Sequence, residues 1–150
     1  MKYWLIKSEP SAYSIQNLEQ DRKTIWDGVR NYQARNFLRQ MTKNDLAFFY
    51  HSNTKTPGIV GLARVVESEV VDPTQFDAKS KYYDPKAIIE KPRWHTVTIE
   101  FIEKFPKIIA LTKLKAEFDG DRLLVVRKGN RLSVMPIAEE IAEKILYMAK

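Results

Sequence analysis

Two apolar runs without polar alternation predict the buried strands of this chain. The first is YWLIK at residues 3–7, which a turn at residues 8–10 ends, and the second is LAFFYHS at residues 46–52. Aromatic and β-branched residues are typical of strands, and a strand covered on both faces has no polar face to show. We therefore expect a buried first strand and a central strand further along the chain.

Three other segments carry weaker strand patterns. Apolar and polar residues alternate over 94–104, as in an antiparallel strand with one face in water. A long strand is expected from Gly58 to about Val71, and Gly61 within it indicates a bulge or a close backbone approach. RLSV at 131–134 predicts a short strand. The middle of the chain is therefore predicted to be mostly sheet.

Helices are predicted from capping residues and helical spacing. Ser14 can accept hydrogen bonds from unpaired backbone N–H groups and so cap a short helix over 15–20. Asn31 is a plausible cap for a second helix that runs to about Met41. On this second helix the spacing directs Ala34, Phe37, Leu38 and Met41 towards the core, and Tyr32, Arg35 and Arg39 to another flank.

The end of the chain adds a short helix over 112–114 and a closing amphipathic helix over 138–148. Regular strand–helix alternation, which a doubly wound parallel sheet needs, is absent. We predict one α+β domain over residues 1–150, built on a twisted, mixed or mainly antiparallel, barrel-like sheet flanked by helices. Residues 72–92 are too irregular for a regular element and too aromatic for a linker, which favours a packed, functional loop.

Charge and composition narrow the class of partner. The formal net charge is +6, from 25 basic and 19 acidic residues, which fits either a polyanionic partner or a mixed solvated surface. The chain has no cysteine, no apolar run of membrane-spanning length and no signal peptide pattern. These features predict a protein of the cytoplasm, or of the nucleus in a eukaryotic cell, without membrane contact.

Standard catalytic motifs are poorly represented. His51 lies beside Ser52, but adjacent strand residues point to opposite faces, so this histidine cannot easily activate its neighbour. The two histidines fall in no recognised metal-ligand spacing, and the five glycines form no phosphate-binding loop. We therefore expect no metal and no cofactor.

Aromatic side chains next to hydrogen-bonding groups are the remaining candidate chemistry. Flat aromatic walls with a few polar groups suit a planar heterocycle, which is stacked on its faces and paired at its edge. Trp26 and Trp94 fit a site or a core position equally well, and Asp27 fits a site or a local turn. The candidates at element ends are Trp26, Asp27, Asn31, Tyr50, His51, Ser52, Tyr82, Tyr83 and Trp94.

Several of these residues belong to motifs that resemble one family. The motifs span nearly the whole chain in the order YWLIKSEP at 3–10, WDGVRNYQARN at 26–36, FFYHS at 48–52, DPT at 72–74, YYDP at 82–85, Trp94 and RLSV at 131–134. The chain on these grounds resembles the EVE domain proteins, relatives of the thymocyte nuclear protein family. They belong to the wider group of PUA-like folds that includes the YTH readers.

The resemblance implies binding without turnover, in a pocket that accepts a modified base of nucleic acid. It implies 5-methylcytosine or 5-hydroxymethylcytosine as the base, and DNA rather than RNA as the polymer. Trp26 resembles the first tryptophan of the family's aromatic cage. The other residues that fall in motifs expected around the pocket are Asp27, Asn31, Tyr50, His51, Ser52 and Trp94.

Three hypotheses follow. In the first, a monomeric reader holds the base beside Trp26 while cations bind the flanking phosphates. In the second, a hydrolase or transferase acts on modified nucleotides or RNA, with His51 as general base and Asp27 as its partner. In the third, the aromatic surface binds a peptide. The reader hypothesis assigns the phosphates to Lys7, Arg30, Arg35 and Arg39, and the pocket rim to Ser8, Tyr82, Tyr83, Arg131 and Ser133.

Overall fold

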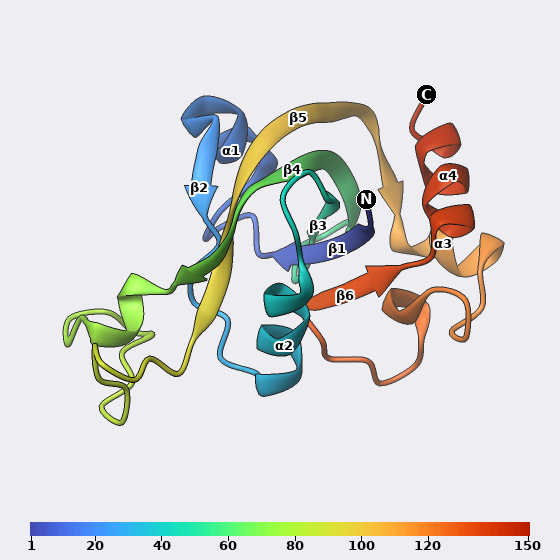
Figure 1. Ribbon diagram of the computed structural model, residues 1–150. Helices are drawn as coiled ribbons and strands as arrows, with labels where there is room; N and C mark the ends of the chain where they lie inside the picture. The colour runs from blue at the N-terminus through green and yellow to red at the C-terminus, as the bar shows by residue number, and fades with distance from the viewer.

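The computed structural model describes residues 1–150 and places the two apolar runs side by side inside a six-stranded sheet. They form β1 (Tyr3–Ser8) and β3 (Leu46–His51), which pair in parallel. The strand order is β2-β5-β4-β3-β1-β6, and every other pair is antiparallel. The predicted α+β fold with a twisted, mixed sheet is thereby confirmed (Figure 1).

Alternate side chains of β1 and β3 enter two separate cores, one on each face of the sheet. Tyr3 and Leu5 belong to the core on one face, whereas Trp4 and Ile6 belong to the core on the other. The side chains of β3 divide in the same way because the side-chain period of a strand is two. Burial on both faces explains why the two segments are apolar throughout.

Two long strands complete most of the sheet. β4 (Gly58–Val71) and β5 (His95–Ala110) are curved along their length, and their pairing has several register shifts. Gly61 lies at one of these shifts, and a Cβ added there would come within 2.5 Å of the Glu103 carbonyl oxygen. The predicted close backbone approach at Gly61 is therefore confirmed. The edge strands are β2 (Lys23–Ile25) and β6 (Val134–Ile137).

Helices cover both faces of the sheet. α1 (Ile15–Asp21) and α2 (Tyr32–Gln40) lie on one side, and α3 (Leu111–Glu117) and α4 (Glu139–Met148) lie on the other (Figure 1). Ser14 caps α1 through a capping box with Asn17, and Asn31 caps α2 by accepting from the Ala34 N–H at 2.9 Å. Both predicted caps are confirmed.

Several boundaries differ from the sequence prediction. β5 begins one residue later than predicted and continues to Ala110, because its outer half pairs with β4 although its pattern is irregular. The last strand is four residues long, as predicted, but it begins at Val134 rather than at residue 131, because its pairing with β1 starts at Val134. β2 and two 3-10 turns, η1 (Pro73–Phe76) and η2 (Leu124–Val126), were not predicted, since segments of three or four residues carry no period.

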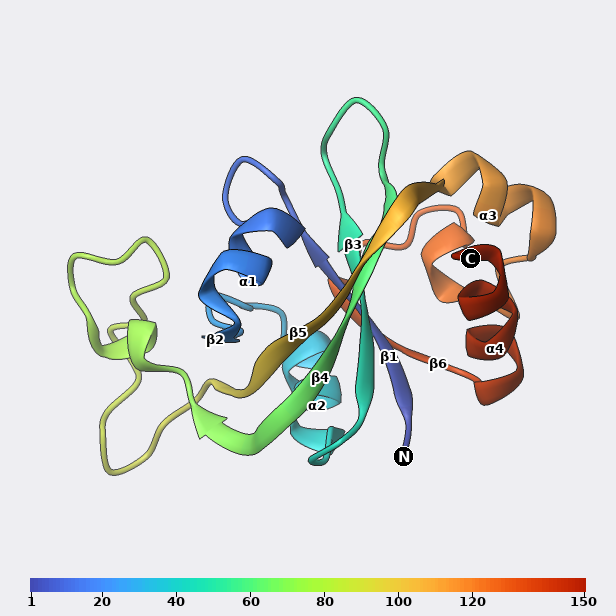
Figure 2. The ribbon, with the colours of Figure 1, turned by 90° about the horizontal axis from the view of Figure 1, so that it is seen from above.

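The segment between β4 and β5 projects from the ends of these strands (Figure 2). It is held by side-chain hydrogen bonds rather than by a sheet, and Gln75, which is fully buried, donates to the carbonyl oxygens of Asp72 and Trp94 at 2.7 and 2.8 Å. A packed loop was predicted here. No helix of the structure has the length and apolar character needed to cross a membrane.

Candidate functional site

The carboxyl ends of β1 and β3 bring together five of the predicted site residues. Because the two strands are parallel, their ends meet at one edge of the sheet. Lys7 stands opposite Tyr50 and Ser8 opposite His51, and the Ser52 N–H donates to the Ser8 carbonyl oxygen at 3.0 Å. We call these five residues, together with Trp26, the strand-end cluster.

Trp26 joins this cluster from the segment between β2 and α2. Its side chain is only 7% exposed, and its ring meets Phe49 and Tyr13 edge to face at centroid distances of 5.4 and 6.3 Å. Its backbone N–H donates to the Val97 carbonyl oxygen at 2.9 Å, and its carbonyl oxygen accepts from Thr96 Oγ1 at 2.5 Å. The indole is therefore a wall in a fixed orientation.

The indole N–H of Trp26 has no partner in the protein. The other two tryptophans differ, because Trp4 Nε1 donates to Asp45 at 3.0 Å and Trp94 Nε1 donates to Asp84 at 2.8 Å. A buried indole N–H usually finds an acceptor. Trp26 Nε1 is not among the enclosed unpaired atoms, which are Arg64 Nε and His95 Nδ1, so it reaches the molecular surface. It is a donor available to a ligand.

His51 has a structural role. Its Nε2 accepts from the Ile15 N–H at 3.1 Å, so it anchors the start of α1, and its ring lies edge to face on Phe49 at 5.7 Å. The accepting nitrogen must be unprotonated, which makes the imidazole neutral with its proton on Nδ1. Burial lowers the pKa of His51 and supports the same state. The lone pair that a general base would use is thus already occupied.

Lys7 and Tyr50 lie on the opposite face of the sheet from His51. The Lys7 Nζ stands 5.6 Å from the centroid of the Tyr50 ring, and no carboxylate forms an ion pair with it. Burial lowers the pKa of Lys7 and raises that of Tyr50. An ammonium group without a carboxylate partner gives this edge of the cluster an affinity for anions.

Asp27 and Asn31 follow Trp26 along the chain. Asn31 is a helix cap, so its side-chain oxygen is occupied, and only its amide NH₂ is free. The Asp27 carboxylate is exposed and accepts no hydrogen bond from another residue. Partial desolvation by neighbouring atoms, followed by the charge of Asp72, raises the pKa of Asp27, and Arg30 opposes this rise.

Arg30 belongs to a second assembly, which holds the 72–94 segment against the start of α2. All five N–H groups of its guanidinium donate within the protein, to Asp72, Thr74, the Val29 carbonyl oxygen and, twice, the Tyr82 carbonyl oxygen. No donor remains for a phosphate, so the predicted role of Arg30 as a phosphate contact is not supported by its geometry. We call the assembly the loop network, formed by Arg30, Tyr32, Asp72, Thr74, Gln75, Tyr82, Asp84, Arg93 and Trp94.

Trp94 lies in the loop network rather than opposite Trp26. Its ring stacks on Tyr32 at 4.9 Å with 13° between the planes, and the Arg30 guanidinium stands 5.0 Å from its centroid. Trp26 and Trp94 share no ring contact. The structure therefore brings Trp26 and His51 together on the ring of Phe49, places Tyr50 on the other face of the sheet, and puts Trp94 in the loop network.

The remaining predicted residues occupy the surroundings of these two assemblies. Arg35 lies over the Tyr32 ring at 4.8 Å and donates to the Arg93 carbonyl oxygen, whereas Arg39 is exposed and makes no hydrogen bond. The Tyr82 ring covers Gly28, where an added Cβ would lie 2.7 Å from it, and Tyr83 is 43% exposed.

On the other border of the cluster, the Ser133 carbonyl oxygen accepts from the Lys7 N–H at 2.8 Å. Arg131 is exposed. Ser8 Oγ donates to the Tyr13 carbonyl oxygen at 2.6 Å. The rim predicted at residues 131–133 therefore adjoins the strand-end cluster directly.

Sequence reasoning missed three residues whose side chains hold the backbone at or next to the two tryptophans. Asp72 is almost completely buried and accepts from the Gly28 N–H at 2.9 Å and from Arg30 at 3.0 Å, so it fixes the segment that follows Trp26. Thr96 and Gln75 hold the two tryptophans by main-chain contacts. The only sequence signal was the motif DPT at 72–74, in which Asp72 caps η1.

The two principal surface cavities lie elsewhere. One, of about 520 Å³, lies between α3 and α4, and the other, of about 250 Å³, lies at the amino end of β1. Neither contains a residue of the strand-end cluster. Within the cluster, Trp26, Tyr50 and His51 are each less than 10% exposed, whereas Lys7, Ser8 and Ser52 are half-buried and give it access to solvent.

Comparison with known proteins places the chain among relatives with the same architecture. The model of the EVE domain family matches residues 2–148. Thymocyte nuclear protein 1 of Rattus norvegicus is 40% identical over 97% of this chain and 73% of its own length.

Solved structures extend the likeness to three dimensions. A protein from Pseudomonas syringae is 46% identical and superimposes with a TM-score of 0.94 over 99% of both chains. Human THYN1, solved in complex with DNA containing 5-methylcytosine, is 36% identical, with a TM-score of 0.92 over 100% of this chain and 98% of its own. The YTH domain of Mmi1, solved with RNA, shares the fold alone, at 9% identity and a TM-score of 0.57.

Proposed function

The chain belongs to the EVE domain family, and on this premise we propose that it is a non-enzymatic reader of methylated or hydroxymethylated cytosine in DNA. The human relative was solved with DNA containing 5-methylcytosine. The single observation that carries the proposal is the Trp26 indole, an oriented aromatic wall whose N–H has no acceptor in the protein.

The chemistry of cytosine fits the groups left free beside Trp26. The base presents an exocyclic amino donor and ring acceptors on its pairing edge, and carboxylates accept from this amino group in base recognition. Asp27 supplies an unpaired carboxylate and Trp26 an unpaired N–H. In the proposed complex, a base taken out of the stack would use this acceptor and this donor in place of the pairing that it lost.

The energy of recognition comes from stacking and edge bonds more than from the added methyl group. Stacking on an aromatic side chain contributes about 1–3 kcal/mol per base. Burial of one methyl group contributes only about 0.8 kcal/mol, or roughly fourfold in affinity. Strong discrimination between cytosines must therefore use a hydrogen bond to the modification or a close fit around it.

A binding role is favoured over a catalytic one by the state of His51. The Ile15 N–H already occupies Nε2, and burial depresses the pKa, so a proton acceptor for hydrolysis or transfer is missing at this position. Incubation with modified mono- and oligonucleotides, followed by mass spectrometry, tests this point. A product that disappears in His51→Ala would establish the hydrolase or transferase instead.

A peptide-binding role makes a different prediction. Free modified nucleosides should compete with the ligand of a base reader and leave a peptide-binding module unaffected.

The family model over 2–148 supports one functional domain across the chain. The rat relative is named a nuclear protein. For this chain the nucleus of a eukaryotic cell, or otherwise the cytoplasm, stays a prediction.

The decisive experiment removes the indole N–H and keeps an aromatic ring. Trp26→Phe should weaken binding to an oligonucleotide with one 5-methylcytosine about five- to tenfold, the cost of one hydrogen bond to the ligand. Alanine is less informative, because loss of a buried tryptophan costs about 3–5 kcal/mol of stability. Fluorescence anisotropy on single- and double-stranded DNA and RNA of one sequence measures the effect. Unchanged affinity in a folded Trp26→Phe protein would remove the Trp26 N–H from the contacts to the base and overturn the observation that carries the proposal.

A further inference from the structure

The segment Arg127–Arg131 concentrates three cations without an acidic residue. Its sequence is RKGNR, and we call it the basic loop. Arg127 forms one exposed ion pair with Asp121 at 3.4 Å, whereas Lys128 and Arg131 form none. Free cations grouped in this way form a surface suited to a polyanion.

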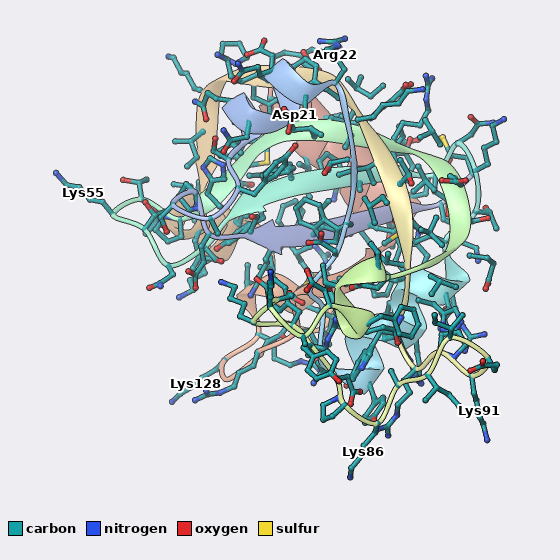
Figure 3. The ribbon with its side chains drawn as sticks, turned by 90° about the vertical axis from the view of Figure 1, so that its left-hand side faces the viewer. Asp21, Arg22, Lys55, Lys86, Lys91 and Lys128 are labelled. Carbon is teal, nitrogen blue, oxygen red and sulfur yellow. The ribbon has the colours of Figure 1, made fainter.

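The basic loop leads directly into the strand-end cluster. Two residues after Arg131, the Ser133 carbonyl oxygen accepts from the Lys7 N–H, and Val134 then pairs with Ile6. Lys128 projects on the same side of the molecule as Lys55, which belongs to the hairpin that follows Ser52 (Figure 3). The chain therefore joins both loops to the strand-end cluster, the hairpin through Ser52 and the basic loop through Ser133.

The backbone of the basic loop is held in place although its charges are free. The Asn130 side chain donates to the Leu124 carbonyl oxygen and accepts from the Leu132 N–H at 2.8 Å. Leu132 packs against both cores. Gly129 adopts φ 79°, which turns the chain sharply between Lys128 and Arg131. An ordered backbone reduces the entropy that is lost when these cations bind.

Two of the four cations predicted as phosphate contacts are already occupied within the protein. Arg30 has no free N–H group, and Arg35 lies over Tyr32 and donates to Asn36 and to the Arg93 carbonyl oxygen. We propose that Lys128 and Arg131 of the basic loop bind the phosphates that flank the base held in the strand-end cluster. This inference rests on the proposed function, since the phosphates belong to the DNA that carries the base.

The salt dependence of binding measures these contacts. Each phosphate neutralised contributes about 0.7 (single strand) to 0.9 (duplex) to the slope of log affinity against log salt. Loss of two contacts should lower the magnitude of this slope by about 1.4–1.8 and reduce affinity roughly tenfold or more near physiological salt. Phosphate contacts carry no sequence information, so modified and unmodified DNA should be affected equally.

The test compares two double variants with the same change in charge. Lys128→Gln/Arg131→Gln alters the basic loop, and Lys2→Gln/Lys43→Gln alters exposed lysines at the amino ends of β1 and β3. The control positions lie about 17 Å from the strand-end cluster, from the rise per residue of β1. Each protein is titrated with matched oligonucleotides that contain cytosine or 5-methylcytosine, at several salt concentrations.

We expect the slope to fall in the basic-loop variant alone, with the preference for 5-methylcytosine intact. A slope equal to that of the wild type, or an equal fall in the control variant, would overturn the basic-loop proposal. Failure of the proposed function has another signature, because the wild-type protein would then bind both oligonucleotides equally at every salt concentration.

Discussion

Trp26 and Trp94 have nearly the same exposure, 7% and 6%, but opposite hydrogen-bonding states. The indole N–H of Trp94 is paired with Asp84, whereas that of Trp26 is free. Exposure alone would assign both residues to the core. The difference teaches that a buried candidate binding residue is recognised by the polar group that the protein leaves unpaired.

The same contrast separates the two assemblies to which these residues belong. In the loop network, Arg30 uses all five donors, and the Asp72 carboxylate accepts from three other residues. In the strand-end cluster, Lys7 has no carboxylate partner and Trp26 has a free donor. The loop network therefore supports the segment that carries Trp26, whereas the strand-end cluster keeps polar groups without a partner in the protein.

The largest effect on stability is expected at the centre of the loop network. Asp72→Ala should lower the free energy of unfolding by about 3–5 kcal/mol, because Arg30 and the Gly28 N–H lose a buried acceptor. Urea denaturation measures this loss. The matched control is Asp121→Ala, where an exposed carboxylate should change stability by less than about 0.5 kcal/mol. A loss under about 1 kcal/mol at Asp72 would contradict the assigned role.

Trp94→Phe should lower stability rather than affinity, the reverse of the effect expected for Trp26→Phe. Removal of the Trp94 N–H leaves Asp84 without its strongest donor and should cost about 1 kcal/mol of stability. Affinity for the modified oligonucleotide should change less than about twofold, since this N–H is not free for a ligand. Melting and anisotropy titrations of both variants test the pair. A loss of affinity at Trp94 equal to that at Trp26 would place both indoles in the base pocket.

Acid should act on the two assemblies in different pH ranges. Burial lowers the pKa of His51 below its ordinary 6.5, so its contribution to stability is present above about pH 6.5 and is lost as pH falls through the folded value. Burial alone would raise the pKa of Asp72, but hydrogen bonds from Thr74, Gly28 and Arg30 hold it below 3.8. Its contribution is present above about pH 4 and is lost below it.

The free energy of unfolding should therefore fall in two steps as pH decreases. His51→Gln should reduce the upper step, whose remainder comes from His95, where burial and then Arg39 lower the pKa. Asp72→Asn should reduce the lower step, to which Asp45 and Asp84 also contribute because hydrogen bonds lower their pKa values as well. Denaturation curves between pH 7 and about pH 3 measure both. An upper step of full size in His51→Gln would show that this histidine does not titrate on unfolding as proposed.

The smallest effect is expected from the exposed arginine of α2. Arg39→Gln should lower the magnitude of the salt slope by at most about 0.7–0.9, the share of one phosphate, because this side chain is free but lies on the α2 flank. Salt titrations of Arg39→Gln and of the basic-loop variant, carried out together, compare α2 with the basic loop directly. A decrease larger than that of Lys128→Gln/Arg131→Gln would move the phosphate path to α2.

Much of the architecture was determined by the sequence alone, because its causes are local. Continuous apolar runs predicted β1 and β3, and a strand buried on both faces has no alternative to such a composition. The caps Ser14 and Asn31 act on N–H groups within three residues of themselves. The motifs around Trp26 and at 48–52 also identified the family.

Only the tertiary structure decided which of the predicted residues remain free to bind. Arg30 and Arg131 are both arginines beside an asparagine, but four of the five hydrogen bonds of the Arg30 guanidinium reach residues more than 40 positions away, whereas the Arg131 side chain has no partner. Trp26 and Trp94 differ for the same reason, since folding brings an acceptor to only one of them. Availability of a polar group depends on neighbours that folding supplies, and no local pattern records them.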